Sequence, residues 1–212
     1  MAYVLGFFAA DGYITHNKRG AQFWSIQITD KNLLVEIKKS VSAEHKISVY
    51  KKSGKEKTLY RLQIGSKEMC NDLAQLGFTP RKTKNMSVPN IPENYFSHFV
   101  RGYFDGDGNI WCGTVHKERK TVHMTLQTTF TSCSKDFLKN LQVRLGQTIS
   151  LRGSLATLSS GRKNPYFRLQ YSKNDSLQLY KFMYNRATIR LLRKQKQFER
   201  SISNICGGSS TG

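Results

Sequence analysis

Residues 96–110 read FSHFVRGYFDGDGNI, and the fold of the chain can be worked out from this stretch. Its apolar residues recur at the spacing of one helix face, which predicts a helix that stops at Gly108. Gly102 and Gly106 are four residues apart, so another backbone could approach this face closely. Asp107 would then lie at the negative end of the helix dipole, where a carboxylate is electrostatically unfavourable. Its presence there is better explained by a bound cation than by a contribution to stability. The alternative is an ordinary helix end rich in Asp and Gly.

The same pattern occurs near the start of the chain, where residues 4–14 read VLGFFAADGYI. The two copies are offset by 107 − 11 = 96 residues, close to half the chain. Such a repeat predicts two half-domains that meet at paired helices, with Asp11 and Asp107 next to each other. The matching pairs are Gly6 and Gly102, Phe8 and Phe104, Asp11 and Asp107, Gly12 and Gly108, and Ile14 and Ile110.

The composition points to a polyanionic partner. The 212 residues include 34 Lys and Arg against 14 Asp and Glu, a formal net charge of +20. This excess argues against an enzyme of neutral metabolites. No apolar run is long enough to span a membrane and no signal peptide is recognisable, so we expect no membrane partner. The four cysteines lack CxxC spacing, which indicates reduced thiols of an intracellular protein.

Each half of the chain follows the order helix, hairpin, helix, hairpin, helix. In the first half, alternation and turn residues predict strands over 13–17, 22–29, 46–52 and 58–64, with helices over 30–42 and 67–76. In the second half, they predict strands over 109–115, 121–131, 149–156 and 166–172, with helices over 134–145, 175–184 and 188–203.

The predicted fold class is therefore α+β, with duplicated αββαββα half-domains. Each half-domain would be a four-stranded antiparallel sheet with helices on one face. We expect the N-terminal half-domain over residues 1–77, a linker over 78–94, the C-terminal half-domain over 95–204 and a flexible tail over 205–212.

The fourth strands repeat almost literally, with YRLQ at residues 60–63 and FRLQ at residues 167–170. In the major groove Arg reads guanine edges and Gln reads adenine edges, while basic hairpin turns hold phosphates. The alternative is a polar face that is merely solvated. The residues predicted to bind DNA from the two polar faces are Ser25, Gln27, Lys46, Ser48, Arg61, Gln63, His123, Thr125, Gln127, Ser150, Arg152, Arg168 and Gln170.

Taken together, residues 4–12 and 100–108 and the two hairpins after each resemble the LAGLIDADG homing endonucleases, in the single-chain form with two motif copies. The resemblance extends from Val4 to about Ser203. It implies a saddle of two sheets on a long, pseudo-palindromic double-stranded DNA target, cleaved by a monomer to leave short 3′ overhangs. It also implies an intron-encoded protein of an organelle or of a bacterial or phage cytoplasm.

The resemblance also implies roles for individual residues. The last acidic residues of the two motif helices, Asp11 and Asp107, would be catalytic and bind metal, together with Ala10 and Gly106. Lys82 and Lys194 match the basic residue near each active site, although Arg81 and Arg193 are neighbours. Asp30 and Ser132 would line a solvent pocket. Ala9 stands where the second copy has Asp105, so the half-sites are expected to differ.

The chemistry of the expected reaction agrees with these residues. Phosphodiester hydrolysis needs neutralisation of charge on the attacking and leaving oxygens, which Mg²⁺ ions held by carboxylates supply. Mn²⁺ or Ca²⁺ would substitute in binding. Two other hypotheses stay open: an RNA maturase that helps a group I intron fold, with intron RNA as a partner, and a DNA-binding relative that has lost cleavage. Retention of both Asp11 and Asp107 argues against the latter.

Overall fold

The computed structural model describes residues 1–51, 57–80, 86–115, 123–158 and 165–207. The chain forms two compact units, the first with residues Met1–Gly106 and Thr188–Leu191, the second with Asp107–Ala187 and Leu192–Gly212. Almost all of the second motif helix therefore belongs to the first unit. Within the described ranges, no helix combines the length and the apolar character needed to cross a bilayer.

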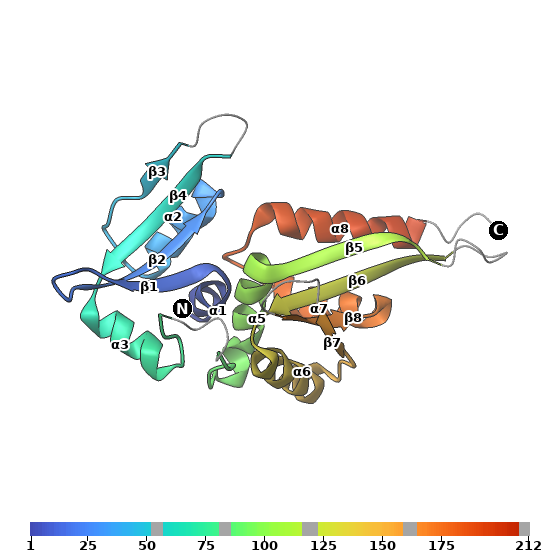
Figure 1. Cartoon of the computed structure of the whole chain (residues 1–212). Helices are drawn as coiled ribbons and strands as arrows, with labels where there is room; N and C mark the ends of the chain where they lie inside the picture. The colour runs from blue at the N-terminus through green and yellow to red at the C-terminus, as the bar shows by residue number, and fades with distance from the viewer. Residues whose placement is uncertain (52–56, 81–85, 116–122, 159–164, 208–212) are drawn as a thin grey trace. The chain divides into compact units, whose positions relative to one another are not determined.

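The first unit contains one antiparallel sheet with the strand order β1-β2-β4-β3 (Figure 1). Helices α1, α2 and α3 pack on it. The elements are α1 (Ala2–Asp11), β1 (Gly12–His16), β2 (Gln22–Ile28), α2 (Lys31–Ser40), β3 (Ser48–Tyr50), β4 (Leu59–Gly65), α3 (Lys67–Gln75) and α5 (Glu93–Asp107).

The second unit repeats this topology, with the strand order β5-β6-β8-β7 and packing by α6, α7 and α8. Its elements are β5 (Gly108–Val115), β6 (His123–Ser132), α6 (Lys135–Ile149), β7 (Ser154–Leu158), β8 (Tyr166–Tyr171), α7 (Lys173–Tyr184) and α8 (Leu192–Gly207). The predicted fold class, duplicated half-domains with four-stranded antiparallel sheets, is confirmed. The exact half-domain and linker boundaries stay a prediction.

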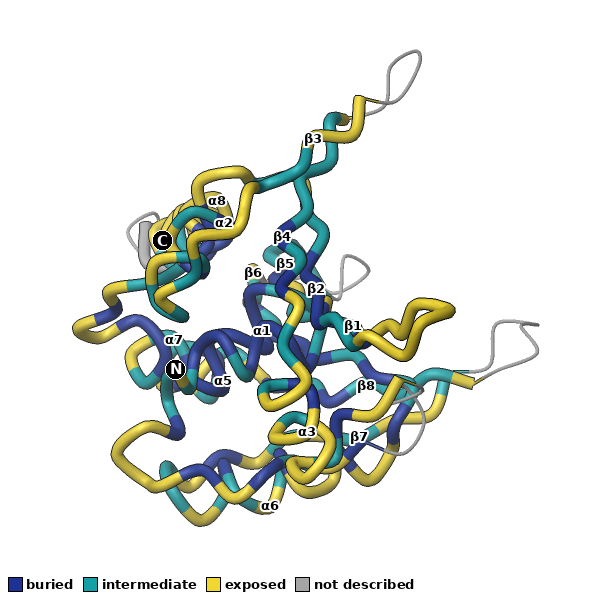
Figure 2. The backbone as a smooth tube through the Cα atoms, turned by 90° about the vertical axis from the view of Figure 1, so that its left-hand side faces the viewer, coloured by how far each residue is buried: buried dark blue, intermediate teal, exposed yellow. Residues whose placement is uncertain are grey.

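Glycines bring α1 and α5 into backbone contact. A methyl group on Gly6 would overlap the carbonyl oxygen of Phe99, and one on Gly102 would overlap the carbonyl oxygen of Tyr3. Both helices are buried along most of their length (Figure 2). Such close approach requires residues without a Cβ, which is the role that the sequence predicted for Gly102.

The glycine after α1 serves a different purpose. Gly12 has an extended conformation, with φ −81° and ψ 156°, so it does not end the helix through a left-handed conformation. A Cβ on Gly12 would instead overlap the ring of Phe8. Gly12 therefore makes room for a buried aromatic ring at the point where the helix turns directly into β1.

Two predicted strands differ from the structure. α6 extends to Ile149, and Ser150 ends it in a left-handed conformation, with φ 55°. The loop that follows is held by Gln142 Nε2, which donates to the Gly153 carbonyl oxygen at 2.6 Å. Ser150 and Arg152 therefore lie in a loop before β7. In the first unit β3 begins only at Ser48, so Lys46 is an exposed loop residue too.

The cysteines described are free thiols, as predicted. Cys70 is buried in α3, and this burial raises the pKa of its thiol. A raised pKa keeps the thiol protonated at neutral pH, so Cys70 is part of the core and not a reactive group.

Candidate active site and nucleic-acid interface

The first acidic candidate, Asp11, is the exposed last residue of α1. The ends of α1 and α5 pack together here, because a methyl group on Gly106 would overlap the Ala10 side chain and lie 3.2 Å from Asp11 Oδ2. The carboxylate of Asp11 therefore lies beside the last turn of α5. Ala10 and Gly106, predicted as metal-binding positions, form the packing contact that holds the two helix ends close.

The second acidic candidate, Asp107, is the last residue of α5 and is half-buried. Thr131 Oγ1 on β6 donates a hydrogen bond to the Asp107 carbonyl oxygen at 3.0 Å. This carbonyl belongs to the group that a helix leaves unsatisfied at its C-terminal end. The bond ties the acidic helix end to the neighbouring strand and fixes where the residue lies.

The two helix ends suit a hard divalent cation. Carboxylate and carbonyl oxygens are the ligands that Mg²⁺, Mn²⁺ and Ca²⁺ take, and the negative end of a helix dipole favours positive charge. Among the described residues no cluster of three or more His, Cys, Asp or Glu is placed to hold a metal ion. A cation at either helix end would therefore need further oxygen ligands from water or substrate.

Lys194 is distinguished from its neighbours by burial. It lies near the start of α8 and is only 6% exposed, whereas Arg193 and Lys196 are exposed. A Lys side chain is seldom buried unless its ammonium group has partners. Lys82, its predicted counterpart, lies outside the described residues, as does Arg81.

Asp105 has a structural role that the sequence did not reveal. It is 1% exposed, and its Oδ2 accepts one hydrogen bond from the Tyr3 hydroxyl and one from the Leu191 backbone N–H, each at 2.7 Å. Leu191 directly precedes α8, so this carboxylate fixes the residue from which the helix with Lys194 begins. Ala9, at the matching position of the first copy, is an ordinary buried residue.

Arg101 reinforces the same region from the preceding turn of α5. It is 1% exposed, donates from Nε to the Ile189 carbonyl oxygen at 2.9 Å and lies over the Tyr3 ring at 5.3 Å. Its Nη2 also donates to His98 Nδ1 at 2.9 Å. Burial, and then the positive charge of Arg101, lower the pKa of His98. His98 is therefore neutral at pH 7, as an acceptor at Nδ1 requires.

The two residues predicted to line a solvent pocket each accept a hydrogen bond from a nearby backbone N–H. Asp30 Oδ1 accepts a hydrogen bond from the Leu33 N–H at 3.0 Å and begins α2. Ser132 Oγ accepts from the Ser134 N–H at 3.0 Å, just before α6. Asp30 follows β2, as predicted, whereas Ser132 is the last residue of β6. Their role toward solvent or substrate stays a prediction.

The polar face of the first sheet brings several of the predicted DNA-binding residues together. In the strand register Gln27 and Ser48 flank Arg61 from the two neighbouring strands, and Ser25 pairs with Gln63. Directly paired residues lie on the same face, so these five residues share one surface. Ser25 is fully buried, and its hydroxyl has no hydrogen-bond partner among the described residues. It differs in this from Gln27, Arg61 and Gln63, which are partly exposed, and its contact with DNA stays a prediction.

Arg61 is held in place by an aromatic residue that the sequence analysis missed. Its guanidinium carbon lies 4.9 Å from the ring centroid of Tyr50 on β3. Its buried Nε has no hydrogen-bond partner among the described residues. The stacking restricts the conformations of the Arg61 side chain. The signal in the sequence was the alternation of Ser48 and Tyr50, which places Tyr50 on the polar face.

The second sheet repeats the arrangement. Thr129 and Ser154 flank Gln170, while Thr131 and Ala156 flank Arg168. Thr125 and Gln127 lie on the same face of β6 by alternation. His123 pairs with Val115 at the far end of the hairpin. The long side chains of Arg168 and Gln170 thus stand between small residues.

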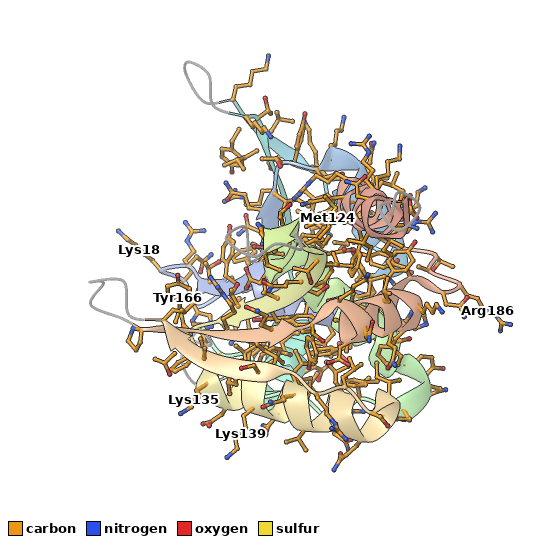
Figure 3. The ribbon with its side chains drawn as sticks, turned by 90° about the vertical axis from the view of Figure 1, so that its right-hand side faces the viewer. Lys18, Met124, Lys135, Lys139, Tyr166 and Arg186 are labelled. Atoms are coloured by element: carbon orange, nitrogen blue, oxygen red, sulfur yellow. The ribbon has the colours of Figure 1, made fainter. Side chains whose placement is uncertain are left out.

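Basic residues lie at the hairpin ends. Lys18 and Arg19 are exposed in the turn between β1 and β2, and Lys18 points away from the sheet (Figure 3). Lys51 and Lys57 are exposed beside the second hairpin. The other basic residues of the predicted hairpin turns lie outside the described ranges; they are Lys52, Lys55, Lys117, Arg119, Lys120, Arg162 and Lys163.

Comparison with protein families gives one match, to the LAGLIDADG-like domain, over residues 1–83. An uncharacterised protein of Methanocaldococcus jannaschii is 20% identical over 215 residues, which cover 97% of this chain and 72% of that protein. The match to the family covers α1, the first sheet and α3. It therefore includes Asp11, at the end of α1, and Arg61, on β4.

Solved structures extend the likeness to the whole chain. The LAGLIDADG meganuclease I-AabMI bound to uncleaved DNA has a TM-score of 0.61 at 18% identity, over 98% of this chain and 91% of that one. I-DmoI in complex with DNA and Ca has a TM-score of 0.61 at 16% identity, over 94% and 96%. I-DmoI in complex with DNA and Mn has a TM-score of 0.58 at 16% identity, over 88% and 96%. At these identities the likeness shows a common fold.

Proposed function

We propose that this chain, which carries a LAGLIDADG-like domain in residues 1–83 and the fold of LAGLIDADG homing endonucleases over its length, is a site-specific double-strand DNA endonuclease. It hydrolyses phosphodiesters with divalent cations at a long pseudo-palindromic target and leaves short 3′ overhangs. One observation carries the proposal: two helices, each ending in an Asp that is followed at once by Gly and a strand.

In this proposal Asp11 and Asp107 hold the cations from the two helix ends. Mg²⁺, or another divalent cation, supplies neutralisation of charge on the attacking and leaving oxygens. That I-DmoI was crystallised with DNA and Ca or Mn supports a divalent cation. Lys194, and Lys82 in the first half, place a fixed positive charge near the phosphate. Fixed charges of this kind stabilise a transition state because they need no reorganisation.

The polar faces of the two sheets provide the specificity. Each sheet addresses one half of the target, with Arg61 and Gln63 in one half and Arg168 and Gln170 in the other. A single chain supplies both halves, so the active protein is a monomer. The net charge of +20 supports a polyanionic partner, because Lys and Arg bind phosphates without regard to sequence.

The test is cleavage of a library of duplexes with randomised sequence, in Mg²⁺, with sequencing of the ends produced. We expect Asp11→Asn and Asp107→Asn each to abolish double-strand cleavage, while duplex affinity stays within about tenfold of the wild type, because only the cation ligand is lost. Asp72→Asn, at an exposed position of α3, is the matched control and should cleave normally.

Two results would contradict the proposed function. Full cleavage by either variant would remove that Asp from the active site. A wild-type chain that binds structured intron RNA tightly and never cleaves any duplex would replace the endonuclease with the maturase hypothesis.

A further inference from the structure

A large, exposed aromatic side chain lies on the polar face of the second sheet. Trp111 on β5 is 42% exposed, although Trp is usually well covered in folded proteins. Its neighbours on the strand, Ile110 and Cys112, face the helices: Ile110 is buried, and Cys112 Sγ donates to the Ser201 carbonyl oxygen of α8 at 3.6 Å. Alternation therefore places Trp111 on the opposite face, directly paired with Gln127.

A glycine allows the indole to lie along the strand. A Cβ on Gly113 would be only 2.8 Å from Trp111 Cζ2 and 3.2 Å from Cε2, so the six-membered ring covers Gly113. Glycine weakens a strand, and within one it often marks a place where another group lies close to the backbone. The pair Trp111–Gly113 thus forms an apolar platform on a surface with many polar residues, which we call the Trp111 platform.

At the matching place of the first sheet the aromatic ring belongs to Phe23 on β2, which pairs with Thr15 and lies next to Gly65. With the offset of 96 residues that relates the motifs, Thr15 corresponds to Trp111 and Asn17 to Gly113. Thr15 is exposed on β1 at the matching place on its sheet. The two sheets therefore differ here in the strand that carries the aromatic ring and in its kind, with an indole on β5 in the second unit and a phenyl ring on β2 in the first.

We propose that the Trp111 platform contacts the base edges of the duplex and favours a thymine there, through its 5-methyl group. The proposal rests on the proposed function, in which this face meets the major groove. Thymine presents an apolar methyl group in that groove, and apolar side chains recognise it. Gln127 beside the indole, with Thr125 next to Gly113, supplies polar contacts to the adjacent base edges. This thymine would lie in the half of the target that the second sheet addresses.

The two tryptophans of the chain allow a direct test. Trp24 is 2% exposed and packs against Phe8, so acrylamide should quench mainly the fluorescence of Trp111. We expect a bound duplex, selected by the wild-type chain from a randomised library, to protect Trp111 from acrylamide. Binding is followed separately by the anisotropy of a label on the duplex. Trp111→Phe retains Trp24 and should show no protection.

The same duplex tests whether the protein prefers a thymine. Each thymine is replaced in turn by deoxyuridine, which lacks only the methyl group. We expect one replacement, in one half of the target, to weaken binding by the wild-type chain about fourfold, the equivalent of burying one methyl group, about 0.8 kcal/mol. Trp111→Ala should be insensitive to that replacement. Gly113→Ala, which keeps the indole but displaces it, should be insensitive too.

Thr15→Ala is the matched control and should respond to deoxyuridine as the wild type does. The results separate the two proposals. A duplex that binds by anisotropy while Trp111 stays fully open to acrylamide overturns the platform and leaves the endonuclease standing. Protection of Trp111 without any thymine dependence overturns the base preference. A chain that binds no duplex at all overturns both.

Discussion

Asp105 and Asp107 are two residues apart in the same helix, yet they lie in different environments. Asp105 is buried and accepts hydrogen bonds from Tyr3 and Leu191, while Asp107 is partly exposed at the end of α5. Two positions along a helix point in nearly opposite directions, so one faces the core and the other does not. One Asp thus holds the structure, while the other lies where the proposed function places a cation ligand.

The contact between buried Arg101 and half-buried His98 makes stability depend on pH. Burial and Arg101 lower the pKa of His98 in the folded chain, whereas unfolded His titrates at about pH 6.5. Below about pH 6.5 the unfolded chain therefore binds a proton that the folded chain does not, which favours unfolding. We expect the melting temperature to fall from about pH 7 to pH 5, and less so in His98→Gln.

Gln is the informative replacement, because its amide oxygen can still accept from Arg101 but does not titrate. His45→Gln changes an exposed histidine of the loop before β3 and serves as the control. Equal pH dependence in the wild type and His98→Gln, measured by thermal melting, would show that His98 does not couple protonation to folding.

At the scale of elements, α1 and α5 are held by backbone contact. Gly6→Ala would drive a methyl group into the carbonyl oxygen of Phe99, and a carbonyl in a helix cannot move aside. We expect a loss of about 1–3 kcal/mol or more in the free energy of unfolding, measured in urea. Gly146→Ala in α6 is the control, since its methyl group would lie 3.5 Å from the nearest atom. That change should gain up to about 1 kcal/mol through helix propensity.

Strands β4 and β8 are the elements expected to read sequence. Arg61→Ala should relax the base preference in one half of the target only, at a cost of about 1–3 kcal/mol against the preferred base, and Arg168→Ala should do so in the other half. Cleavage of a randomised library by each variant measures this. Tyr50→Ala should weaken the preference that depends on Arg61, while Tyr50→Phe, which keeps the ring, should not. A uniform loss of activity with unchanged preferences would make both arginines backbone contacts.

At the scale of the whole molecule, we expect the net charge of +20 to dominate the binding of DNA. A protein that neutralises 6–10 phosphates loses about 10³-fold or more in affinity between 50 and 200 mM salt, because binding releases counterions. We expect this steep dependence in a fluorescence titration, and a nearly flat curve would contradict a major role for phosphate contacts.

Substitution of single lysines tests which of them contact phosphates. Lys18→Ala, at the tip of the first hairpin, should reduce the salt slope by about one unit if it contacts a phosphate. Lys139→Ala should leave the slope unchanged, because Lys139 extends outward from α6, which covers the helix side of its sheet (Figure 3).

The sequence by itself determined the architecture. Apolar periodicity and turn residues are local signals, so two copies of one motif, each followed by two hairpins, were enough to predict both sheets, their helices and the polar faces. The position of Asp11 and Asp107 at helix ends followed from the same signals, because a helix that stops at Gly leaves the preceding residue at its end.

Only the tertiary structure decided which residues meet across long separations. Asp105 reaches Tyr3 and Leu191, 102 and 86 residues away, and no pattern along the chain records such a pairing. The same holds for the burial of Lys194 beside exposed Arg193, and for Ser150, whose left-handed conformation ends α6 where alternation suggested a strand. Hydrogen bonding and desolvation act between segments that the fold brings together, so their outcome depends on packing and not on local propensity.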